Sequence, residues 1–138
     1  MKIVVSACLL GENCKYNGGN NYSAAVAKFV EGREAIPVCP ERLAGLGIPR
    51  EPIEIVSGVV RRQDGTSVDE ALRKAVGQIL AQLEGQDIEC VILKSRSPTC
   101  GVKQVYDGTF SGVLVDGMGV LASALQEKGY KVVDSEDL

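Results

Sequence analysis

Hydrophobic residues form short, continuous runs at several points along this chain. Runs rich in Val and Ile occupy residues 3–8, 35–39, 88–94 and 131–134, and residues 53–62 also have an extended pattern. Continuous apolar runs of this length are typical of strands that are buried on both faces, as in a parallel sheet. We therefore predict that these runs are strands.

Between these runs, apolar residues recur at helical spacing in three segments. The first is 24–30, with Asn21 or Ser23 as its N-cap. The second begins at Ser67-x-x-Glu70, the spacing of a capping box, and ends at Gly85. Its apolar face comprises Val68, Leu72, Val76, Ile79, Leu80 and Leu83. The third follows a predicted cap at Asp116, ends at Gly129, and has Val120, Leu121, Ala124 and Leu125 on its inner face.

The alternation of strands and helices predicts the fold class. It indicates an α/β protein: a single three-layer domain over residues 1–138, with a mainly parallel, Rossmann-like sheet and helices on both faces. A chain of 138 residues suits one hydrophobic core. Residues 9–21, 40–52 and 106–112 are too rich in Gly, Asn or Pro for regular structure. A loop as long as 40–52 in a compact domain is usually functional.

Composition limits the cellular location and the binding partners that we expect. No apolar run approaches the roughly 18 residues that cross a bilayer, and the N-terminus does not resemble a signal peptide, so we expect a cytoplasmic protein without a membrane partner. The net charge of −3 argues against general nucleic-acid binding. Cytoplasmic thiols stay reduced, and five is an odd number, so a disulfide framework is not expected.

The chain contains no histidine. This excludes Ser-His-Asp and Cys-His catalysis and mixed Cys/His zinc fingers within the chain. A general acid or base must therefore be Glu, Asp, Lys, Tyr or Cys. Metal ligands, apart from any supplied from outside the chain, must be thiolates or carboxylates.

Three cysteines follow predicted strands directly or within a few residues. Cys8 ends the run Val4-Val5-Ser6-Ala7-Cys8, Cys39 lies in Ile36-Pro37-Val38-Cys39-Pro40, and Cys100 follows the strand 88–94. The carboxyl ends of parallel strands meet at one edge of a sheet, where α/β proteins bind ligands. Three thiolates at one place suit iron or zinc, and an iron–sulfur cluster with three cysteines would leave one iron open. For each cysteine alone, a buried structural role remains the alternative.

The other two cysteines carry weaker signals. Cys14 follows Cys8 at a spacing that matches no zinc or ferredoxin motif. It is a candidate fourth ligand, a sulfur carrier or a loop thiol. Cys90 lies within a predicted strand, so we expect it in the core.

Polar residues near these cysteines are candidates for catalysis and binding. Glu41 follows Cys39-Pro40 and is the best candidate for a general acid or base, with a solvated surface carboxylate as the alternative. Ser95 and Ser97 either form a turn before Pro98 or orient water and substrate. Lys94 and Arg96 are candidates for holding a carbonyl or an anion.

Several motifs, in this order, resemble a bacterial family that was long called a domain of unknown function, whose characterised members are thiouracil desulfidases of the TudS type. The motifs are Val5-Ser6-Ala7-Cys8-Leu9-Leu10-Gly11 with Cys14, Cys39-Pro40-Glu41, Pro49-Arg50-Glu51-Pro52, Leu93-Lys94-Ser95-Arg96-Ser97-Pro98-Thr99-Cys100-Gly101 and Tyr106-Asp107-Gly108-Thr109-Phe110-Ser111-Gly112. The resemblance covers nearly the whole chain.

The resemblance implies a [4Fe–4S] cluster held by Cys8, Cys39 and Cys100, with its fourth iron free to bind the sulfur of a thiolated uracil. It further implies a non-redox reaction in which C=S becomes C=O and hydrosulfide leaves. By motif position, Glu41 and Ser97 would be catalytic and would activate the incoming water. The implied partner is a small thiolated base; the oligomeric state is not predicted.

Two other functions remain open at this point. A non-catalytic zinc- or cluster-binding module in sulfur handling or sensing would fill every coordination position, with Cys14 as fourth ligand. A thiol–disulfide protein using Cys8 and Cys14 is disfavoured because the chain has no C-x-x-C motif.

Overall fold

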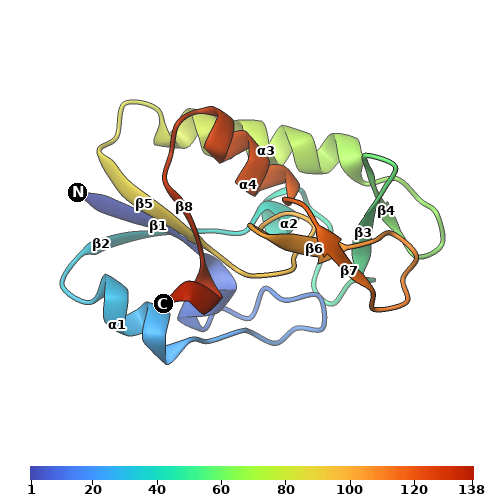
Figure 1. Cartoon of the computed structure of the whole chain (residues 1–138), viewed down its shortest axis with the longest axis horizontal. Helices are drawn as coiled ribbons and strands as arrows, with labels where there is room; N and C mark the ends of the chain where they lie inside the picture. The colour runs from blue at the N-terminus through green and yellow to red at the C-terminus, as the bar shows by residue number, and fades with distance from the viewer.

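A four-stranded parallel sheet forms the centre of the computed structural model, which describes residues 1–138 (Figure 1). Its strands, in spatial order, are β2 (Glu34–Val38), β1 (Lys2–Ser6), β5 (Ile88–Leu93) and β8 (Val132–Asp134). Val4 of β1 is in register with Ile36 on one side and Val91 on the other. The continuous apolar runs therefore predicted the sheet correctly, although β1 ends at Ser6 and not at Cys8.

Helices cover both faces of this sheet, so the three-layer prediction is confirmed. Helices α3 (Asp69–Leu83) and α4 (Val120–Glu127) lie on one face, and α1 (Ala24–Val30) lies on the other (Figure 1). Side chains alternate along β1: Val4 packs in the core under α3 and α4, whereas Ile3 and Val5 pack in the core towards α1. No helix has both the length and the apolar character needed to cross a bilayer.

The remaining elements are short and gather at the carboxyl edge of the sheet. They are the 3₁₀ helices η1 (Ala7–Leu10) and η2 (Ser135–Asp137), the one-turn helix α2 (Pro40–Leu43), and the hairpins β3 (Ile53–Val56) with β4 (Val59–Arg62) and β6 (Gln104–Tyr106) with β7 (Leu114–Asp116). Figure 1 shows both hairpins at the end of the molecule away from the N-terminus. They extend the molecule beyond the edge where the cysteine-bearing loops lie.

Three local predictions are wrong. Asp116 belongs to β7 and caps nothing; α4 begins after Gly119. The capping box at Ser67 does not form, because α3 begins at Asp69 and its N-cap, Val68, makes no side-chain bond. Residues 40–52 are not wholly irregular, since Pro40, which is well suited to a first helical turn, opens α2.

Candidate active site

A pocket of about 530 Å³ opens at the carboxyl edge of β1, β2 and β5. Its volume falls within the range of small-molecule sites. Four cysteines from three connections after strands line it: Cys8 and Cys14 follow β1, Cys39 follows β2, and Cys100 follows β5. All four are free thiols, whereas Cys90 lies outside the pocket and is buried in the core, as predicted.

The local fold explains how these thiols reach the pocket. Cys8 lies on η1 immediately after β1, and Cys39 is the N-cap of α2 immediately after β2. The backbone N–H of Lys94 donates to Ser6 Oγ at 3.0 Å, which ties the end of β5 to the end of β1. The loop that carries Cys100 therefore starts next to Cys8.

Helix α4 fixes the loop that carries Cys100. The first N–H groups of α4 have no partners within the helix, and loop carbonyls accept from them: Val120 N donates to Pro98 O and Leu121 N to Thr99 O, each at 2.9 Å. Gly119 permits this approach, because a Cβ there would lie 2.4 Å from the carbonyl carbon of Thr99. The loop is consequently held rigidly by backbone contacts.

Burial controls the chemistry of the thiols. It raises the pKa of Cys100 to about 12 and also raises the pKa of Cys8 and Cys14 above the usual value. The negative charge of neighbouring thiolates adds to this effect at Cys14, which lies beside Cys39 and Cys8. Without a metal these groups are thiols, and a soft metal centre would displace their protons on binding.

The donor set around the pocket is of the type that iron–sulfur clusters use. Thiolates are the usual ligands of such clusters. No three of the Cys, Asp and Glu side chains converge as closely as the ligands of one metal ion do. The pocket nevertheless brings four thiols together, the ligand type that such a cluster uses.

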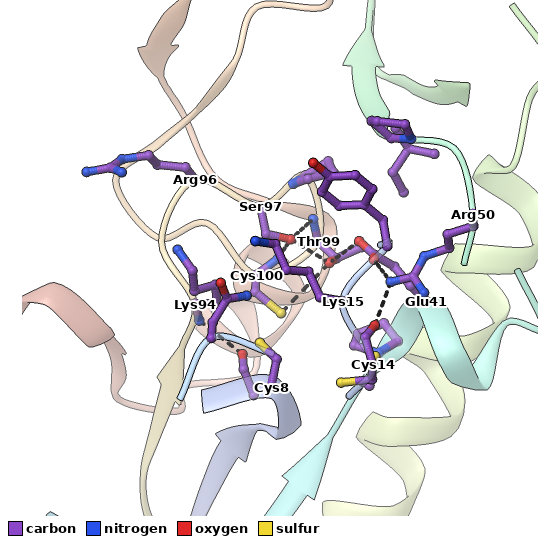
Figure 2. Close-up of a pocket in the computed structure, with 18 of the residues that line it drawn as sticks. Cys8, Cys14, Lys15, Glu41, Arg50, Lys94, Arg96, Ser97, Thr99 and Cys100 are labelled. Atoms are coloured by element: carbon purple, nitrogen blue, oxygen red, sulfur yellow. Dashed lines mark hydrogen bonds and ion pairs between the residues drawn. The ribbon is translucent and has the colours of Figure 1, made fainter. Parts of the chain in front are cut away.

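A chain of polar side chains runs along the pocket wall beside the thiols (Figure 2). Ser97 Oγ and Thr99 Oγ1 are 2.8 Å apart, and Thr99 Oγ1 donates to Glu41 Oε1 at 3.1 Å. Glu41 Oε2 accepts from Arg50 Nη2 at 2.5 Å. Glu41 is therefore engaged on both oxygens, which makes the solvated surface alternative untenable.

The predicted binding residues divide into two groups. Lys94 Nζ donates to Ser95 Oγ at 3.0 Å, and both side chains line the pocket. Arg96 also lines it, but its guanidinium pairs with Glu136 of η2 and points away from the sulfur atoms in Figure 2. Lys94 and Ser95 are thus better placed than Arg96 to meet a ligand.

The sequence did not single out several lining residues as functional. Arg50 and Thr99 complete the polar chain, and Tyr16, Tyr106 and Phe110 give the pocket apolar, planar walls. The sequence signals for Arg50 were its place in a long loop expected to be functional and in the motif Pro49-Arg50-Glu51-Pro52. Only folding brings the aromatic residues together.

Comparison with known proteins shows the family to which this chain belongs. The model of the 2-thiouracil desulfurase family matches residues 3–137, and this chain belongs to that family. A solved structure similar to it is the [4Fe-4S]-dependent thiouracil desulfidase TudS, with a TM-score of 0.90 and 35% identity over 99% of this chain and 92% of that one. The uncharacterized protein YbbK of Bacillus subtilis (strain 168) is 37% identical over 146 residues, covering 99% of this chain and 97% of YbbK.

Proposed function

We propose that this protein is a [4Fe–4S]-dependent desulfidase that converts the C=S group of a thiouracil-like base to C=O. The overall reaction consumes one water and releases the sulfur as hydrosulfide, with no net oxidation or reduction. The observation that carries the proposal is the meeting, in one pocket, of four free thiols with the hydrogen-bonded Glu41. The similarity to TudS supports it.

In this proposal Cys8, Cys39 and Cys100 hold the cluster, which when bound supplies a soft Lewis acid that prefers sulfur to oxygen. Glu41 is the general base and Ser97 the hydroxyl that handles the attacking water. Lys94 and Ser95 bind the polar edge of the base, with Arg96 at the margin. Tyr16, Tyr106 and Phe110 offer flat apolar surfaces to a planar ring.

The deciding experiment is anaerobic reconstitution with iron and sulfide, followed by measurement of sulfide released from 4-thiouracil. A brown, cluster-bearing protein that releases sulfide and uracil in equal amounts is expected. A cluster-bearing protein that releases no sulfide from any thiolated base would overturn the catalytic proposal.

A second candidate is a non-catalytic cluster- or metal-binding module, favoured by one observation: Cys14 is buried beside Cys39, where it is a candidate fourth ligand. The variant Cys14→Ala separates the two functions. It keeps the cluster and the activity if three cysteines suffice, and it loses the cluster if all four are ligands.

A further inference from the structure

The hydrogen bonds around Ser97 determine where its proton lies. Ser97 Oγ accepts from two backbone N–H groups, those of Thr99 and Cys100, each at 3.1 Å. A hydroxyl oxygen has two lone pairs and one proton. Because both lone pairs are engaged, Ser97 must be the donor in its 2.8 Å contact with Thr99 Oγ1.

Counting lone pairs and protons in the same way fixes the direction of the hydrogen bond that Thr99 donates. Its hydroxyl accepts from Ser97 and has one proton to donate. Two acceptors are within reach, Glu41 Oε1 at 3.1 Å and Cys100 Sγ at 3.8 Å. The carboxylate oxygen is nearer and is the stronger acceptor, so the proton points to Glu41.

We propose that Thr99 is a proton relay between Ser97 and Glu41, and that the path runs in one direction, from Ser97 through Thr99 to Glu41. No direct hydrogen bond joins Ser97 to Glu41, so the Thr99 hydroxyl is the connection between them. The proposal rests on the desulfidase function proposed above. It adds Thr99, which acts by passing a proton between Ser97 and Glu41.

The proton transfers balance along this path. The O–H bond of Ser97 breaks as a new O–H bond forms on Thr99, while the original proton of Thr99 moves to Glu41. The resulting Ser97 alkoxide keeps its two N–H donors and accepts a proton from water, which yields hydroxide for attack on the thiocarbonyl carbon. When the C–S bond breaks, the proton held by Glu41 passes to the departing sulfur, which leaves as hydrosulfide. The remaining O–H proton of the adduct passes to solvent as C=O forms, and every residue returns to its starting state.

The surroundings of Thr99 hold it in the geometry that a relay needs. The residue is 1% exposed. Its carbonyl accepts from Leu121 N and Ala122 N at the start of α4, and Gly119 packs directly against its backbone. A β-branched side chain has few rotamers, so the hydroxyl stays between its two neighbours.

The test compares Thr99→Val, which keeps the shape but removes the hydroxyl, with Thr99→Ser, which keeps the hydroxyl. In the reconstituted holoenzyme, Thr99→Val is expected to lower kcat about 100-fold, the usual size of an acid–base contribution, with KM and iron content unchanged. Thr99→Ser should stay within about threefold of the native rate. Thr66→Val, in an exposed turn, serves as the control. A Thr99→Val enzyme with more than half the native kcat would overturn the relay.

Two further measurements separate a relay from a purely structural residue. In mixtures of H₂O and D₂O, the native rate should fall along a curve, because several protons move together, and Thr99→Val should remove that curvature. Neutron diffraction from D₂O-exchanged crystals should place deuterons on Ser97 Oγ towards Thr99 and on Thr99 Oγ1 towards Glu41. Deuterons in the opposite order would overturn the relay whatever the substrate, whereas a native enzyme without desulfidase activity would overturn only the proposed function.

Discussion

Arg50 and Glu41 form the most buried ion pair of the protein, with 4% of the arginine side chain and 16% of the glutamate side chain exposed. The same guanidinium donates to the carbonyl oxygens of Cys14 at 2.9 Å and Gly47 at 3.0 Å. One arginine thus joins the proposed general base to the loop of Cys14. Lysine, with a single nitrogen, has no matching fork of donors for these three partners.

Replacing Arg50 by methionine should therefore destabilise the protein and inactivate it. The change leaves a mostly buried carboxylate and two carbonyls without their donor, which typically costs about 3 kcal/mol or more. Urea denaturation checks the free energy of unfolding, and sulfide release checks activity. Arg42→Met is the matched control, because its ion pair with Glu12 is exposed and should contribute less than about 1 kcal/mol. Equal losses in both variants would contradict this account.

Single cysteine variants should separate ligands from bystanders. Cys8→Ala, Cys39→Ala and Cys100→Ala are each expected to abolish cluster binding, because each removes a thiolate from the proposed set of three. Cys14→Ala and the core variant Cys90→Ala should retain it. Iron and acid-labile sulfide per chain after anaerobic reconstitution provide the measurement. Full iron content in any of the first three would remove that cysteine from the set.

Glu54 should control how well the pocket holds its ligand. Its carboxylate is 8% exposed, and Oε1 accepts from Gly108 N at 3.0 Å and Phe110 N at 3.2 Å. These bonds hold Phe110 at φ +56°, a conformation that costs a bulky residue free energy. Glu54→Ala should release Phe110 from the pocket wall and raise KM about tenfold, equivalent to roughly 1.4 kcal/mol of binding.

Two further variants test the role of Glu54. Glu54→Gln keeps an acceptor oxygen and should show a smaller rise in KM. Phe110→Leu removes the flat ring but keeps the hydrogen bond from the residue 110 backbone to Glu54. It should raise KM without changing kcat. An unchanged KM in Glu54→Ala would show that the hydrogen bonds to Glu54 do not shape the binding site.

Asp69 should account for part of the acid sensitivity of the fold. Burial raises the pKa of Asp69, whereas the hydrogen bonds that it accepts from Arg73 Nε at 2.7 Å and Val60 N at 3.0 Å lower it. The hydrogen bonds have the larger effect, so the pKa lies below the usual 3.8. A lowered pKa stabilises the fold above 3.8, and this contribution is lost as the pH falls through the folded-state value. Asp69→Asn should cost about 1 kcal/mol at pH 7 and nothing well below pH 3.8. Urea denaturation at both pH values tests this, and a cost that is the same at both would contradict it.

The sequence predicted the sheet well because its strands are continuous and apolar. The hairpin of β6 and β7 was missed since each strand has three residues, too few for a periodic signal, and its loop is rich in glycine. The predicted cap at Asp116 was wrong because of tertiary contacts. The carbonyls of Pro98 and Thr99 accept from the first N–H groups of α4, so no side-chain cap is needed.

The site was only partly accessible from sequence. Cysteines after strands were visible because strand order predicts a shared edge, and the absence of histidine pointed to Glu41. The partners of Glu41 were not visible, since Arg50 and Thr99 reach it from loops on either side of the pocket. Thr99 appeared in the sequence only as one position of a motif, and its role emerges when the hydrogen bonds of Ser97 are counted.

The placement of the cysteines also sets the order of events during maturation. Cys8 and Cys100 lie far apart in the chain and become neighbours only when β1 pairs with β5. A nascent chain cannot gather the proposed ligands until most of it has been synthesised and the sheet has closed. Assembly of the proposed cluster would therefore follow the formation of the sheet.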